Sequence, residues 1–172
     1  MIVDASIILG WLGNKYEKEC LSIKEKFERG LITLKVPSIV KYEVCKFIAN
    51  NIGNSISPDV ASKLSELLLK YLSHISIELN EKDYALAVKL SGELNIDLSV
   101  ASCLVLSTKL WETYLTAYKN VAKLRKFGYP VLHITEICKL SCTEKLEIRL
   151  CVSYVGGSAS CQMEMWDSAE LE

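Results

Sequence analysis

Short apolar runs alternate with amphipathic segments through residues 1–140. The apolar runs have the length and composition of buried strands and occupy residues 1–3, 31–38, 75–79, 113–117 and 129–135. The segments between them repeat apolar residues at helical spacing and occupy residues 15–29, 39–51, 58–75, 80–95, 97–110 and 118–127. Strands that alternate with helices predict an α/β fold, in which helices flank a mostly parallel β-sheet on both faces.

Polar residues mark where several of these helices begin. Ser57 followed by Pro58 is a typical helix start, because serine caps free backbone amides and proline fits the first helical position. Ser38, Asn80 and Asp97 occupy the same capping position before three other segments. The helix predicted at residues 58–75 also repeats large side chains at helical spacing, which indicates either a core face or a dimer surface: Leu64, Leu67, Leu68 and Tyr71.

The segment 141–172 has a different pattern. Apolar and polar residues alternate on both sides of Gly156-Gly157, which predicts a two-residue β-hairpin. If Val155 pairs with Ser158, the register places Tyr154 opposite Ala159 and Val152 opposite Cys161, and it sorts both strands into an apolar and a polar side. We therefore divide the chain into an α/β domain, 1–140, and a C-terminal β-hairpin extension, 141–172, whose apolar face covers this domain or a second copy.

The composition indicates a globular domain with a sizeable core. Half of the 172 residues are hydrophobic and the mean hydropathy is +0.20, which argues against disorder. A net charge of −1 disfavours a protein that holds nucleic acid by bulk charge alone. No uncharged apolar run approaches the roughly 20 residues of a membrane span, and the start "MIVDAS" lacks the pattern of a secretory signal, so we expect a cytoplasmic protein.

Seven cysteines are many for a cytoplasmic protein. They form no C-x-x-C motif, and the spacing of the last four fits no familiar zinc pattern. Buried thiols are the simpler interpretation, and disulfides remain the alternative.

Three acidic residues occupy positions that a parallel sheet brings to one edge. Asp4 ends the first strand, Glu43 lies in the helix after the second strand, and Asp97 opens the helix that leads to the fourth. Clustered carboxylates repel one another unless a cation neutralises them, and Mg²⁺ or Mn²⁺ prefers oxygen ligands. Such an ion supports hydrolysis of phosphodiesters. Each acid also has a simpler interpretation: Asp4 and Asp97 as helix caps, and Glu43 as a solvated helix residue.

Four segments resemble, in order and spacing, the successive motifs of PIN domains, and the resemblance covers about residues 1–137: "MIVDAS", "VPSIVKYEV", "LNIDLSVASCLVLS" and "TYLTAYKNVAKLRKFGYPVLHI". This family includes the ribonuclease toxins of VapC-type toxin–antitoxin pairs, especially the archaeal ones. The resemblance implies a parallel sheet between helices, a homodimer, an antitoxin partner and cleavage of single-stranded RNA. It also implies that Asp4, Glu43 and Asp97 hold Mg²⁺ or Mn²⁺, with Ser6 and Thr116 as supporting hydroxyls.

The chain departs from the family at Tyr118, where a fourth acid usually follows Thr116-Ala117. A phenol with a pKa of about 10 is a poor ligand for Mg²⁺ at neutral pH. Tyr118 either caps a degraded site or stacks on an RNA base. The basic residues that follow it, Lys119 and Lys123 among them, either contact RNA or form a solvated helix face.

The sequence therefore predicts a metal-dependent endoribonuclease of the VapC toxin type, weakened by Tyr118. The alternative is a catalytically inactive PIN module that binds RNA or a protein partner. The helix at residues 58–75 and the hairpin are the candidate contact surfaces of the expected homodimer.

Overall fold

The computed structural model describes residues 1–13, 15–52, 56–140, 152–155 and 158–161. Within them, short parallel strands form the centre of the molecule: β1 (Ile2–Val3), β2 (Val36–Pro37), β3 (Ser76–Ile77), β4 (Tyr114–Thr116) and β5 (Val131–His133). Strands β1, β4 and β5 pair in that order, and β2 pairs with β3. A parallel bridge between Ile2 and Lys35 connects the two sets, so the order is β3-β2-β1-β4-β5 and the predicted parallel sheet is confirmed.

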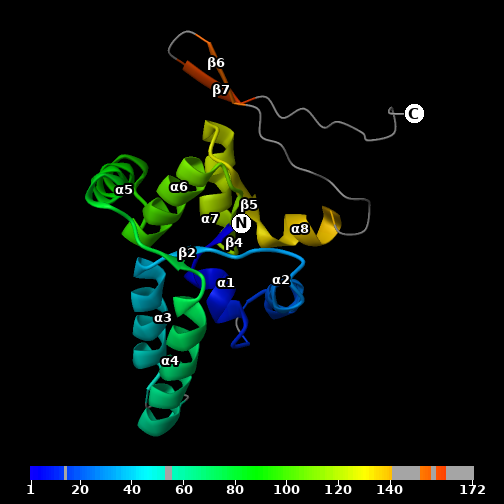
Figure 1. Cartoon of the computed structure of the whole chain (residues 1–172), viewed down its shortest axis with the longest axis vertical. Coiled ribbons are helices and arrows are strands. Elements are labelled where there is room, and N and C mark those ends of the chain that lie inside the picture. Colours follow the sequence, from blue (N-terminus) through cyan, green and yellow to red (C-terminus); the bar gives the residue numbers. More distant parts are fainter. Residues whose placement is uncertain (14, 53–55, 141–151, 156–157, 162–172) are drawn as a thin grey trace.

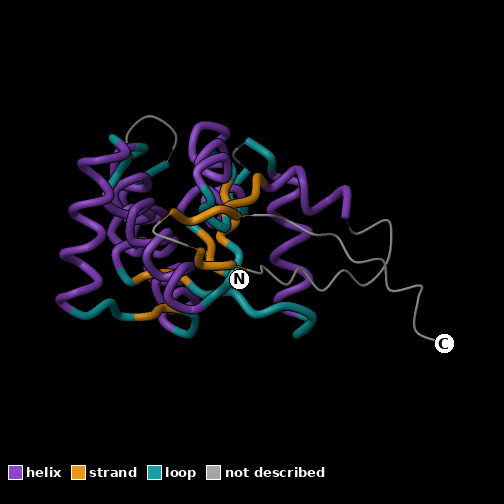
Figure 2. The backbone as a smooth tube through the Cα atoms, turned by 90° about the horizontal axis from the view of Figure 1, so that it is seen from above, coloured by secondary structure: helices purple, strands orange, loops and turns teal. Residues whose placement is uncertain are grey.

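Helices flank this sheet on two sides. They are α1 (Ala5–Gly10), α2 (Glu17–Glu28), α3 (Ile39–Asn50), α4 (Pro58–Ser73), α5 (Glu81–Leu94), α6 (Leu98–Leu110), α7 (Lys119–Ala122) and α8 (Ile134–Leu140). Helix α6 packs on β1, β2 and β4, and α5 packs on α6, whereas α1 and α2 lie on the other side of the strands (Figure 1). Figure 2 shows the strands in the middle of the molecule with helices to either side.

Burial explains why α6 lies closest to the sheet. Every residue from Ser99 to Ser107 is buried, so this helix has almost no solvent face. Ala87 of α5 packs against Ala101 and Val105 of α6, and these small side chains let the two helices approach closely. The start of α6 is thereby fixed against the core, and with it the position of Asp97.

The predicted helix starts are confirmed. The Ser57 hydroxyl accepts a hydrogen bond from the Val60 amide at 3.4 Å, with Pro58 as the first residue of α4. Asn80 and Asp83 cap each other's backbone amides in a reciprocal capping box. Ser38 occupies the predicted position before α3, but its side chain makes no capping hydrogen bond.

Three local predictions were wrong. The predicted strand 31–38 is reduced to Val36–Pro37, because only Lys35 of the preceding residues bridges to β1. The predicted helix 118–127 divides into α7 and a 3-10 helix, Lys123–Phe127, which Gly128 ends at φ 86°. The predicted strand 129–135 stops at His133, where Glu136 accepts the His133 amide hydrogen and α8 begins.

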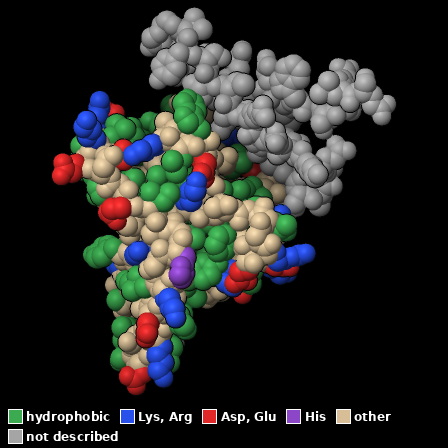
Figure 3. All heavy atoms as spheres, viewed as in Figure 1, with side chains coloured by type: hydrophobic (Ala, Val, Ile, Leu, Met, Phe, Trp, Pro, Cys, Tyr) green, Lys and Arg blue, Asp and Glu red, His purple; other side chains and the backbone are tan. Residues whose placement is uncertain are grey.

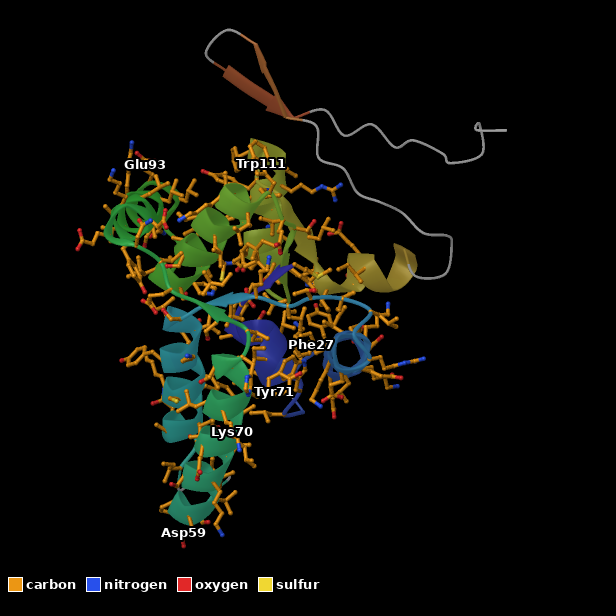
Figure 4. All side chains as sticks on the ribbon, viewed as in Figure 1. Phe27, Asp59, Lys70, Tyr71, Glu93 and Trp111 are labelled. Carbon is orange, nitrogen blue, oxygen red and sulfur yellow. The ribbon has the colours of Figure 1, made fainter. Side chains whose placement is uncertain are left out.

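An aromatic cluster attaches the long α3–α4 pair to the rest of the domain. The Tyr71 ring of α4 meets Trp11 edge-on at 5.3 Å and Phe27 of α2 at 5.8 Å between ring centroids. Figure 4 shows Phe27 and Tyr71 side by side between these helices. Leu64 and Leu68 pack against the same core, whereas Leu67 is 67% exposed, so the apolar face of α4 serves mainly as core.

The predicted hairpin is confirmed in its register. Strand β6 (Val152–Val155) pairs antiparallel with β7 (Ser158–Cys161) and places Tyr154 opposite Ala159. What its apolar face covers, and the state of the cysteines in this extension, lie outside the described residues. In the α/β domain, Cys45 and Cys103 are free thiols.

The surface is mixed in character. On the face drawn in Figure 3, lysine and arginine side chains are interspersed with acidic ones, in keeping with the net charge of −1. In the part of the chain that the structure describes, no single helix has the length and apolarity to cross a membrane. Helices α5 and α6, which are bent relative to each other, have that length and apolarity only when they are taken together.

Candidate active site

Asp4 is the most firmly held residue at the carboxyl edge of the sheet. It follows β1 directly and is 1% exposed. Its Oδ1 accepts hydrogen bonds from the Ser6 amide, at 2.9 Å, and from the Ser6 hydroxyl. Its Oδ2 accepts one from the Tyr114 hydroxyl and one from the Thr116 hydroxyl, both at 2.6 Å. The capping interpretation of Asp4 is therefore confirmed, but the cap uses only one of its two oxygens.

These bonds and the burial of Asp4 act on its carboxyl group in opposite directions. Burial disfavours the charged form and raises the pKa of Asp4, whereas the hydrogen bonds from Ser6, Thr116 and Tyr114 favour the carboxylate and oppose that rise. Four donors around one carboxyl group also fix its orientation. Asp4 is thus a preoriented acid that lacks a neutralising cation among its hydrogen-bond partners.

The same hydroxyls connect Asp4 to the turn between β4 and α7. The Ser6 hydroxyl accepts the Ala117 amide hydrogen at 2.9 Å, and the Thr116 hydroxyl accepts the Tyr118 amide hydrogen at 3.1 Å. Ser6 and Thr116, predicted as supporting residues, therefore hold both Asp4 and the backbone of the turn that carries Tyr118.

Glu43 approaches the cluster from the second turn of α3. The Ser99 hydroxyl of α6 donates a hydrogen bond to its Oε1 at 2.5 Å. Burial raises the pKa of Glu43, and the hydrogen bond from Ser99 opposes that rise. The negative charges of Asp4 and Asp97 raise the pKa further, whereas the positive charge of Lys46 lowers it. Three acids from three separate elements therefore interact electrostatically, and Glu43 is more than a solvated helix residue.

Asp97 is the exposed member of the cluster. It occupies the N-cap position of α6 as predicted, yet its side chain makes no capping hydrogen bond. The capping interpretation thus accounts for its position and leaves its carboxylate available to a ligand.

Tyr118 lies beside all three acids. Burial and the charges of Asp4, Glu43 and Asp97 raise its pKa to about 12, so the phenol is neutral at physiological pH. Tyr118 is still 44% exposed and lines a cleft of about 370 Å³. The other lining residues are Asn95, Ile96, Asp97, Val100, Asn120 and Val121.

The donor set fits a hard cation in charge and ligand type. Two of the acids raise the pKa of the third, which is the effect that a divalent cation would reverse. Among the described residues, however, no three histidine, cysteine, aspartate or glutamate side chains stand close enough together to hold a metal ion. Metal binding would therefore require the exposed Asp97 or the half-buried Glu43 to approach Asp4.

Sequence reasoning missed two supporting residues. Tyr114 lies two positions before Thr116 on β4, so strand alternation places both side chains on one face, and this signal was available. Ser99 had no comparable signal, because only the packing of α3 against α6 brings it to Glu43. Asn120 lines the cleft, and Glu112 lies at the opposite edge of the sheet.

A second, shallower groove begins next to Tyr118. Lys119 and Lys123 lie along it, and its volume is about 520 Å³. The other lining residues are Ala122, Arg125, Lys126, His133, Thr135 and Glu136. Four positive side chains thus line a groove that starts one residue after Tyr118, but contact with RNA stays a prediction.

No protein-family model and no curated protein matches the chain. Several solved structures do match the chain. PAE2754 from Pyrobaculum aerophilum is 16% identical with a TM-score of 0.56, and the match covers 83% of this chain and 96% of that chain. A toxin–antitoxin complex from Klebsiella pneumoniae is 16% identical with a TM-score of 0.54, over 77% of this chain and 96% of that chain.

A third similar structure is FitAB bound to an IR36 DNA fragment. It is 13% identical with a TM-score of 0.57, and the match covers 77% of this chain and 94% of that chain. Identities this low show the fold alone. The chain therefore has a PIN-like α/β fold, a parallel sheet flanked by helices, which these structures share.

Proposed function

We propose that this protein is a metal-dependent endoribonuclease of the VapC toxin type. The observation that carries the proposal is the cluster of Asp4, Glu43 and Asp97 at the carboxyl edge of the sheet, where the charges of two acids raise the pKa of the third. Perturbed carboxyl groups beside an open cleft are typical of sites that bind a cation or transfer a proton. The likeness to a toxin–antitoxin complex supports the same assignment.

In this proposal the three acids hold Mg²⁺ or Mn²⁺, and the ion supplies activation of water and stabilisation of charge on the phosphate. Ser6, Tyr114 and Thr116 orient Asp4, and Ser99 orients Glu43. Lys119 and Lys123 bind the phosphates of single-stranded RNA along the groove beside Tyr118.

We also propose an antitoxin protein as partner, a homodimer and a cytoplasmic location. The helices α3 and α4 offer an apolar surface for such contacts, with Phe47, Val60 and Leu67 exposed. Light scattering of the purified protein tests the dimer, and a monomer at micromolar concentration would contradict it.

A second candidate is a non-catalytic PIN-like module that binds RNA or a protein partner. Two observations favour it: a neutral tyrosine stands where the family has a fourth acid, and no three acids are yet arranged to hold a metal ion among the described residues.

Cleavage of a single-stranded RNA with Mn²⁺ separates the two candidates. The experiment compares the wild type with Asp4→Asn, Tyr118→Asp and the control Glu112→Gln, which changes an acid at the far edge of the sheet. The nuclease proposal predicts cutting by the wild type and the control, and none by Asp4→Asn. If only Tyr118→Asp cuts, the natural protein is the binding module.

A further inference from the structure

The cleft beside Tyr118 contains more than carboxylate ligands. Its walls combine an aromatic ring with three aliphatic side chains, Ile96, Val100 and Val121. Its polar groups are Asp97 and the amides of Asn95 and Asn120. The cleft is thus mainly polar, with the Tyr118 ring as its aromatic surface, and hydrogen-bonding groups beside an aromatic ring are what recognition of an unpaired base requires.

The two amides are available to a ligand. In the part of the chain that the structure describes, the side chains of Asn95 and Asn120 make no hydrogen bond within the protein. Asn95 ends α5 with φ 49°, a conformation that asparagine tolerates better than most residues. A carboxamide both donates and accepts, as the edges of nucleobases do.

Tyr118 is held in place at the border between this cleft and the acids. Its amide donates to the Thr116 hydroxyl at 3.1 Å, and Thr116 in turn donates to Asp4 at 2.6 Å. Tyr118 is 44% exposed and lines the cleft, so its side chain is accessible to a ligand. A neutral ring at this position repels neither a phosphate nor a base, whereas a fourth carboxylate would add negative charge.

We infer that the cleft is a nucleobase pocket, in which the Tyr118 ring stacks on an unpaired base of single-stranded RNA while Asn95 and Asn120 bind the edge of that base. The inference rests on the proposed function, because it requires RNA at the acidic edge. The base next to the scissile phosphate occupies this pocket, and Lys119 follows on the side of the phosphate backbone. Tyr118 is then a specificity-determining residue rather than the remnant of a lost acid.

Binding of RNA that carries the fluorescent base 2-aminopurine tests the pocket without requiring cleavage. The full chain is titrated with short single-stranded oligonucleotides, in EDTA and again in Ca²⁺. The variants are Tyr118→Phe, Tyr118→Leu and Asn120→Ala. The matched control is Tyr42→Leu, which removes a tyrosine that is 69% exposed on α3, away from the cleft.

Stacking predicts that the wild type, Tyr118→Phe and Tyr42→Leu bind alike and quench the fluorescence. Tyr118→Leu binds about tenfold more weakly and loses the quenching, because the stacking of one base on an aromatic ring strengthens binding by about that factor. Asn120→Ala changes the relative affinity for the four homopolymers. Equal binding and quenching by Tyr118→Leu and Tyr42→Leu would overturn the inference, as would a wild type that binds no RNA in either solution.

The two proposals fail in different ways. A protein that quenches through Tyr118 but never cuts RNA has the base pocket without the nuclease. A protein that cuts RNA equally well with leucine at position 118 has the nuclease without the base pocket.

Discussion

The two edges of the parallel sheet treat acidic side chains in opposite ways. At the amino edge, Glu112 accepts hydrogen bonds from Lys35 and from the Met1 ammonium group. At the carboxyl edge, Asp4 accepts hydrogen bonds only from neutral donors: Ser6, Tyr114 and Thr116. An acidic side chain is paired with positive charge at the amino edge, whereas an acidic side chain at the carboxyl edge has only neutral hydrogen-bond partners.

The pKa values follow this difference. Burial works to raise the pKa of Glu112, but the hydrogen bonds and charges of Lys35 and the amino terminus outweigh it and lower the pKa. Burial raises the pKa of Asp4 and of Glu43, and for Glu43 the neighbouring acids add to the rise. Glu112 thus stabilises the fold, whereas the ionised forms of Asp4 and Glu43 are disfavoured by their surroundings, a pattern typical of functional sites.

Tyr114→Phe should give the largest loss of stability, because it removes a buried donor from the Asp4 carboxyl group. A hydrogen bond to a charged group contributes about 1.5–3 kcal/mol, which lowers the melting temperature by roughly 3–12 °C for a chain of this size. Tyr42→Phe on the exposed face of α3 is the control and should change stability by less than about 0.5 kcal/mol. Equal melting curves would mean that the bond to Asp4 contributes nothing.

Glu112→Gln should cost about 1–2 kcal/mol at neutral pH, because Lys35 and the Met1 ammonium lose the acid that lies between them. The pKa of Glu112 is lowered in the folded state, so its contribution is present above the unfolded pKa and is lost as pH falls through the folded value. The penalty should therefore disappear in acid. Chemical denaturation at several pH values measures it, and a penalty that persists in acid would contradict the ion-pair account.

Glu43→Gln should have the smallest effect on stability, and it should stabilise the protein rather than destabilise it. The pKa of Glu43 is raised in the folded state, so the folded protein binds its proton more tightly, and stability falls as pH rises from the ordinary value of 4.5 through the raised value. Glutamine removes this cost and can still accept the Ser99 hydrogen bond. We expect the variant to melt a few degrees higher than the wild type at neutral pH and to match it in acid. A lower melting point at neutral pH would contradict the prediction.

The sequence predicted the parts of the molecule that depend on local pattern. Strand and helix alternation indicated the parallel sheet, capping residues located α4 and α5, and the Gly156-Gly157 turn set the hairpin register. The end of β5 and the division of the 118–127 helix were not predicted, because they depend on packing and on hydrogen bonds such as that between His133 and Glu136.

The positions of the three candidate acids follow from the sequence, whereas part of what holds them does not, and their role as a site stays a prediction. Strand position placed Asp4, and the helix start placed Asp97, because both positions follow from chain geometry. Ser99 and the two asparagines of the cleft come from separate elements that only the tertiary structure brings together. Long-range contacts of this kind leave no periodicity in a single sequence.

The central claim is that the acids of the carboxyl edge bind a divalent cation and that the acid of the amino edge does not. Titration of Mn²⁺ followed by electron paramagnetic resonance measures this directly in the wild type, Asp4→Asn and Glu112→Gln. The account predicts one bound Mn²⁺ in the wild type and in Glu112→Gln, and at least a tenfold weaker site in Asp4→Asn. Equal Mn²⁺ affinity in the wild type and Asp4→Asn would contradict it.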